Sequence, residues 1–237
     1  MGAQWKHAGQ QSNALKRGAM ISKLMKELMV AAKLGGHLPE SNARLRAAME
    51  SARKQSVPRD NIERAVKKGA GLLDEKVIFE TIVYEGFTPH QVPVIVECLT
   101  DNRNRTAADV RVLFRKGQLG ASGSVAWMFD RLGVVEATHA KRDQDLEEVA
   151  IEAGAENVEP MEEVTDGLGA RFFSATTDLD AVSKYLTAAG WTLTMSEMSY
   201  LAKNFVELDS AKREEVTKFL ESIDDNDDVH RLYVGMK

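Results

Sequence analysis

Residues 92–106 read VPVIVECLTDNRNRT, an apolar run followed by a polar turn that carries two arginines. The run at residues 92–99 is rich in valine and isoleucine, which predicts a buried strand. Residues 106–116 follow with apolar side chains at helical spacing, so the unit is a strand, a turn and a helix. Cys98 lies inside the strand, and we expect a buried structural thiol there rather than a nucleophile.

Further strands are expected on both sides of this unit. Upstream, residues 77–85 read as a strand joined to the first by a short turn, and downstream a Gly-rich turn at 117–123 leads to a strand at 124–129. This β-β-α-β set lacks a second helix. The tail offers a helix at 211–223 and a strand at 229–234, so we predict that the tail folds back and completes the domain.

The segment between these two parts has its own alternation of elements. The expected order is strand, helix, strand, strand, helix, strand, which is the ferredoxin-like arrangement. The ranges are 133–137, 146–153, a short strand near Val158, 171–175, 179–189 and 192–197.

The N-terminal part is predicted to be helical. Residues 1–20 carry no apolar period and read as an arm, whereas residues 21–32 form one apolar stripe at helical spacing that ends at Gly35. Asn42 suits the cap of a second helix and Pro58 the first turn of a third. Three short amphipathic helices bury their apolar faces only by packing together, so we expect a small bundle.

The predicted fold class is therefore α+β, with an N-terminal three-helix bundle followed by two αβ domains, the last of them inserted and ferredoxin-like. The expected boundaries are 1–75 for the bundle, 76–131 plus 206–237 for the domain completed by the C-terminus, and 132–205 for the insertion.

Charge is distributed unevenly along the chain. Residues 1–70 hold 14 Lys and Arg against 5 Asp and Glu, a net +9, while the remainder holds 17 against 31, a net −14. Such an opposition predicts a polyanionic partner for the basic part. The alternative is that the basic helices neutralise the acidic domains within the fold.

The expected nucleic-acid contacts are basic side chains of the arm, of the second and third helices, and of the turn after residue 99. Those on the helices lie between apolar positions and are expected to face outward. Arg103 and Arg105 either hold the domain together or meet phosphate, and the internal role is preferred. The set is Lys6, Lys16, Arg17, Arg44, Arg46, Arg53, Lys54, Arg59, Arg64, Lys67, Lys68, Arg103 and Arg105.

No catalytic or metal-binding constellation is predicted. The five histidines are scattered, a single cysteine excludes a multi-thiolate zinc site, and the acidic run at 224–228 reads as a solvated turn. We expect no catalytic residues, no metal, no cofactor and no small-molecule substrate. The sequence also shows neither a secretory signal nor a membrane span, so we expect a cytoplasmic protein.

Several stretches together resemble the YebC/PmpR family. They are residues 42–46, 57–69, 84–87, 94–106 and 123–134, and the similarity runs over nearly the whole chain. The chain departs from the family at its start, where Gly2-Ala3-Gln4-Trp5-Lys6 keeps only the Trp-Lys pair. It also carries Thr88-Pro89-His90-Gln91 where a Gly-Pro-Gly-Gly-like turn is typical.

The resemblance implies three domains and nucleic-acid work without a cofactor. Some members are described as transcriptional regulators that bind promoter DNA, and others as translational activators that act at the ribosome. We therefore expect a non-enzymatic DNA-binding regulator of transcription, with a ribosome-associated factor that binds rRNA or tRNA as the alternative. An enzyme or a pure protein-interaction module is the third hypothesis, and the enzyme is disfavoured because no catalytic constellation is present.

Overall fold

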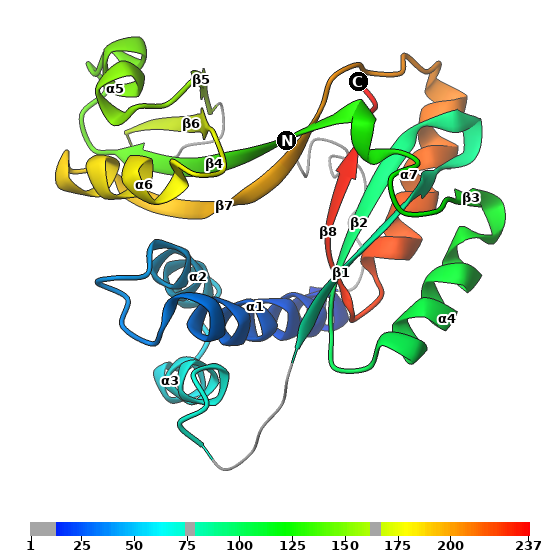
Figure 1. The fold of residues 1–237 in the computed structure, drawn as a ribbon, viewed down its shortest axis with the longest axis horizontal. Coiled ribbons are helices and arrows are strands. Elements are labelled where there is room, and N and C mark those ends of the chain that lie inside the picture. Colours follow the sequence, from blue (N-terminus) through cyan, green and yellow to red (C-terminus); the bar gives the residue numbers. More distant parts are fainter. Residues whose placement is uncertain (1–12, 74–78, 162–166) are drawn as a thin grey trace. The chain divides into compact units, whose positions relative to one another are not determined.

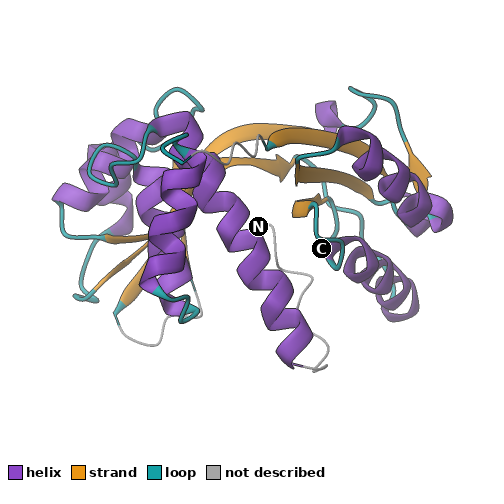
Figure 2. Ribbon diagram, turned by 90° about the horizontal axis from the view of Figure 1, so that it is seen from below, coloured by secondary structure: helices purple, strands orange, loops and turns teal. Residues whose placement is uncertain are grey.

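The computed structural model describes residues 13–73, 79–161 and 167–237. Packing divides these residues into two compact units. Unit 1 takes in the described parts of Met1–Lys26, Val77–Asp130 and Tyr200–Lys237, and unit 2 takes in those of Glu27–Lys76 and Arg131–Ser199. Helices pack beside antiparallel strands throughout (Figures 1 and 2), so the α+β class is confirmed.

Unit 1 is built on a four-stranded sheet in the order β3-β1-β2-β8. A hairpin of β1 (Glu80–Phe87) and β2 (Pro93–Thr100) forms its centre, and β3 (Gln118–Leu119) and β8 (Val229–Val234) are the edges. β8 pairs with β2 through Val94 and Val234, so the tail joins the sheet.

Two helices cover one face of this sheet. They are α4 (Arg103–Leu113) and α7 (Ser210–Asp224). Alternate residues from Val92, just before β2, to Cys98 point into the core that these helices close. On the opposite face Ile95 packs with Val125, Phe129 and Tyr233. Cys98 is fully buried, and burial raises the pKa of its thiol to about 12, which confirms a structural thiol.

Unit 2 contains the second sheet, in the order β5-β6-β4-β7. The chain order is β4 (Phe129–His139), α5 (Leu146–Ala153), β5 (Asn157–Pro160), β6 (Leu168–Ser174), α6 (Leu179–Ala188) and β7 (Thr192–Ala202). This strand order is that of a ferredoxin-like domain, whose two helices share a core of Val135, Phe172, Leu186 and Trp191 with the sheet.

The helical part consists of α1 (Asn13–Gly35), α2 (Ala43–Lys54) and α3 (Arg59–Gly69). Leu28, Leu45 and Ile62, one from each helix, are almost completely buried. Asn42 caps α2, as expected: its side chain accepts from the Leu45 N–H at 3.0 Å and donates to the carbonyls of Ala31 and Gly36 at 2.8 Å.

Three local expectations were wrong. The helix expected from residue 21 begins at Asn13, within the segment read as an arm. α4 begins at Arg103 and is capped by Asn102, so its start is not at residue 106. Residues 124–129 do not form a strand but a turn and a short 3-10 helix, η3 (Ala126–Met128), followed by β4.

The three-domain division stays a prediction. Packing groups the chain differently, because the boundary between the two units falls within α1, β4 and β7.

Candidate nucleic-acid interface

A basic surface lies on the outward faces of α2 and α3. Ala48, Ala52, Ile62 and Val66 bury the inner faces of these helices, so the residues between them turn toward solvent. We define the bundle surface as the exposed basic residues of this set: Arg53, Lys54, Arg59, Arg64 and Lys67. Lys68 is left out because it is half-buried; Arg64 and Lys68 each have an interaction partner of their own.

An ion pair on the bundle surface leaves its arginine accessible. Arg59 Nε lies 2.7 Å from Glu63 Oε1, four residues along the helix, while the Arg59 side chain is 87% exposed. Exposed pairs of this kind contribute little stability and are screened by salt. The guanidinium can therefore exchange Glu63 for a phosphate at small cost.

Arg44 and Arg46 differ from the expectation that they face outward. Arg44 binds the buried Glu27 carboxylate with two nitrogens, Nε at 2.6 Å and Nη2 at 2.9 Å. Arg46 donates to Thr187 Oγ1 at 3.3 Å and is half-buried. A buried carboxylate needs a paired cation, so Arg44 serves the fold of unit 2.

A shallow hollow of about 310 Å³ lies beside this surface. Arg46 and Arg53 line it together with Glu40 and Glu50. Because the hollow is lined by two arginines and two glutamates, its charges give no preference for an anion. We therefore do not include it in the phosphate-binding surface.

The structure describes only some of the basic residues expected in the N-terminal arm. Lys6 lies outside the described residues, and Lys16 belongs to α1, although its side chain is not among those described. Arg17 is exposed on the same helix, in unit 1. Whether these side chains touch phosphate stays a prediction.

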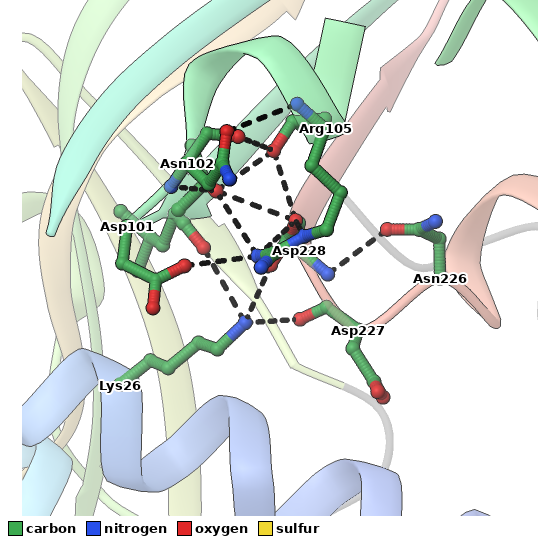
Figure 3. A network of polar contacts seen from close by, with 10 residues as sticks. Lys26, Asp101, Asn102, Arg105, Asn226, Asp227 and Asp228 are labelled. Carbon is green, nitrogen blue, oxygen red and sulfur yellow. Dashed lines mark hydrogen bonds and ion pairs between the residues drawn. The ribbon is translucent and has the colours of Figure 1, made fainter. Parts of the chain in front are cut away.

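Arg105 is held inside unit 1 by Asp228 (Figure 3). Arg105 Nη2 lies 2.9 Å from Asp228 Oδ2 and 2.9 Å from Asp101 Oδ1. Lys26 Nζ lies 3.0 Å from Asp228 Oδ1, and the Thr106 hydroxyl donates to Oδ2 at 2.8 Å. Arg105 therefore makes the internal contacts that were preferred for it, and whether it also meets phosphate stays a prediction.

Asp228 was expected in a solvated acidic turn, and this was wrong, because its side chain is only 6% exposed. Burial by itself raises the pKa of the Asp228 carboxyl. The hydrogen bonds from Arg105, Lys26 and Thr106 outweigh burial, and the pKa lies below its ordinary value. The carboxylate is thus charged at neutral pH and joins α1, α4 and β8.

Arg103 contributes to a second exposed basic row that the sequence reasoning missed. Arg103, Arg111 and Arg115 are all exposed and recur at multiples of four residues along α4 and the 3-10 turn after it. Burial raises the pKa of Tyr84, and the charges of Arg103 and Arg111 act against that rise. The spacing was visible in the sequence, but the net charge of −14 over residues 71–237 taken as a whole concealed it.

Among the residues that the structure describes, no group of three or more His, Cys, Asp and Glu side chains could hold a metal ion. In the same residues no helix is long and apolar enough to cross a membrane.

Comparison with known protein families assigns the chain to one family. The TACO1/YebC protein N-terminal domain matches residues 3–72, and the TACO1/YebC second and third domain matches residues 79–236. The chain belongs to the TACO1/YebC family. The resemblance drawn from the sequence motifs is thereby confirmed.

Relatives match over the full length. A probable transcriptional regulatory protein of Polaromonas sp. is 54% identical over 100% of this chain and 99% of the relative. One of Pseudomonas syringae pv. syringae is 52% identical with the same coverage. The crystal structure of the conserved hypothetical protein Aq1575 from Aquifex aeolicus is 38% identical, with a TM-score of 0.80, and covers 99% of this chain and 96% of that one. The relatives' names describe regulatory proteins rather than enzymes.

Proposed function

We propose that this chain is a non-enzymatic, DNA-binding regulator of transcription that contacts phosphates through the bundle surface and acts in the cytoplasm. The observation that carries the proposal is the exposure of five cations, Arg53, Lys54, Arg59, Arg64 and Lys67, on two adjacent helices. Lys and Arg side chains that contact phosphates release condensed counterions from nucleic acid, which supplies affinity without any cofactor.

The names of the relatives support a regulatory role, and the exposed basic set supports phosphate binding. Neither the names nor the exposed basic set indicates side chains that recognise the edges of particular bases. Lys and Arg side chains that contact phosphates position a duplex, but these contacts carry no sequence information. We expect strong salt dependence and modest sequence preference.

The test is the affinity for a promoter-length duplex, measured by fluorescence anisotropy across a salt series. Replacing Arg59, Arg64 and Lys67 by Gln removes three phosphate contacts, so the slope of log K against log salt becomes shallower by about 3. The control replaces Lys184, Lys212 and Lys218 by Gln, because these lysines are similarly exposed on α6 and α7.

An unchanged slope in the bundle variant would exclude the bundle surface as the contact. Co-sedimentation with ribosomes, combined with weak and sequence-blind duplex binding, would replace the promoter by the ribosome as the target.

A further inference from the structure

Trp127 is an exposed tryptophan in unit 1. It lies in η3, and 69% of its surface is accessible, whereas Trp191 of unit 2 is only 3% exposed. Burying a large aromatic side chain is favourable by a few kcal/mol, so folding alone does not favour an indole in solvent.

A buried carboxylate fixes the turn that carries Trp127 through hydrogen bonds to its backbone. Glu85 is 6% exposed and accepts hydrogen bonds from the N–H groups of Gly123, Val125 and Ala126, each at 2.7 Å. Burial raises the pKa of Glu85, but these three bonds outweigh it and keep the pKa below its ordinary value, so the carboxylate stays charged. The backbone just before Trp127 is therefore fixed.

Buried side chains anchor the turn on both sides of the indole. Val125 is fully buried and Phe129 is 5% exposed, and both belong to the same core cluster. In addition, the Lys203 N–H donates to the Met128 carbonyl at 2.9 Å. An exposed ring on so constrained a backbone loses little conformational entropy when it binds a ligand.

The indole N–H of Trp127 already has a hydrogen-bond acceptor within the chain. Trp127 Nε1 donates to the Ser124 carbonyl at 3.1 Å, within the turn itself. This bond orients the ring, and it leaves the π face as the chemistry that the ring offers to a partner. Stacking on a planar group is the interaction that such a face favours.

The surroundings favour a single planar ring over a protein surface. Ala121, Ser122 and Gly123 of the same turn are exposed and small, so Trp127 has no apolar rim there. Protein hot spots instead sit among contacts that exclude water. Asp130, three residues after Trp127, pairs with Lys203 at 3.3 Å between the charged atoms, so this carboxylate is already neutralised.

We propose that Trp127 is a stacking platform for an unpaired nucleobase of a single-stranded segment, from RNA or from a melted DNA strand. The proposal rests on the proposed function, because the base belongs to the nucleic acid that the chain binds. Duplex DNA does not qualify, since its bases present edges to the grooves and keep their faces stacked.

The experiment uses the full chain and measures binding to a 12-nucleotide oligo-U, a 12-nucleotide oligo-dT and a 12-bp duplex. Trp127→Ala is expected to weaken both single strands by roughly 5- to 150-fold, and to leave the duplex unchanged. Trp127→Phe retains most of the affinity, because phenylalanine still stacks. Val112→Ala is the matched control, since Val112 is also an exposed apolar side chain of unit 1.

A spectroscopic signature separates stacking from a structural role. Oligo-U or oligo-dT should quench tryptophan emission in the wild type, and the quenching should disappear in Trp127→Phe, which retains Trp5 and Trp191. Tighter binding of oligo-U assigns the base to RNA, and the reverse assigns it to DNA. If the wild type binds single strands but Trp127→Ala binds them equally well, the platform is refuted; if the wild type binds neither single strand nor duplex, the proposed function fails instead.

Discussion

Replacing Asp228 by Asn removes a charge from the centre of the network in Figure 3 while preserving the shape of the side chain. Asp228 binds Lys26 at 3.0 Å, the Thr106 hydroxyl at 2.8 Å and Arg105 at 2.9 Å. The Lys26 side chain is only 14% exposed, so the variant leaves a nearly buried cation without its anion.

The magnitude follows from how far each partner is buried. Removing one member of a buried pair costs about 3–5 kcal/mol. The Arg105 side chain is 49% exposed, so water compensates most of its loss, and we expect a decrease of about 3 kcal/mol in the free energy of unfolding at neutral pH. Urea unfolding at pH 7, with hydrogen exchange of the β2 and β8 amides as a probe of unit 1, measures it.

The pH dependence gives an independent check. The pKa of Asp228 is lowered in the folded protein, so its contribution to stability is complete above the unfolded value of about 3.9. It is lost as the pH falls through the folded pKa, and the curves of wild type and Asp228→Asn should converge there. Glu214→Gln is the control, because Glu214 pairs with Lys218 at 2.6 Å but is 68% exposed, and it should not change stability measurably. An Asp228→Asn variant as stable as the wild type at pH 7, or equally weakened at every pH, would refute the reasoning.

Three further predictions concern local features. Gln91 has a φ of 60°, in the left-handed region that favours glycine, so Gln91→Gly should raise the free energy of unfolding by about 0.5–1 kcal/mol in urea titrations; a loss would show that the side chain compensates the strain. Glu85→Gln should lower it by about 2–3 kcal/mol near neutral pH, with the difference shrinking below about pH 4 because the Glu85 pKa is lowered; equal stability would mean that the turn does not need the charge. Cys98, with a pKa of about 12, should not react with a thiol reagent at pH 8 until the chain is unfolded, and rapid labelling of the native protein would contradict its burial.

The parts of the fold that local sequence signals determine were predictable. Helix α5 was expected at residues 146–153 and lies there, because Asp145 caps its first N–H groups and Gly154 ends it in a left-handed conformation. Strand β8 was also placed at its observed bounds, in a short stretch with Val229, Leu232, Tyr233 and Val234 that follows the acidic turn. In both cases the deciding residues are neighbours in the sequence.

Two of the failures involve partners far away along the chain. Residues 124–129 have a strand-like composition. In the structure, however, the N–H groups of Gly123, Val125 and Ala126 all donate to the Glu85 carboxylate. A regular strand does not point three such N–H groups at one carboxylate, so these residues form a turn. The acidic run looked solvated because the partners of Asp228 lie 123 and 202 residues away. Spacing along a sequence does not reveal such contacts.

The two explanations of the basic N-terminal region apply to different residues. Arg44 meets Glu27, and Lys23 and Lys26 meet Asp224 and Asp228, so these cations do neutralise acidic groups within the fold. The bundle surface is different, because Arg53, Lys54 and Lys67 are exposed at the ends of α2 and α3. Cations near helix C-termini favour the helix dipole only slightly, by about 0.3–1 kcal/mol each, which is too little to explain so dense a cluster. A polyanion is the partner whose charge fits the cluster, and the salt series of the bundle variant tests that inference directly.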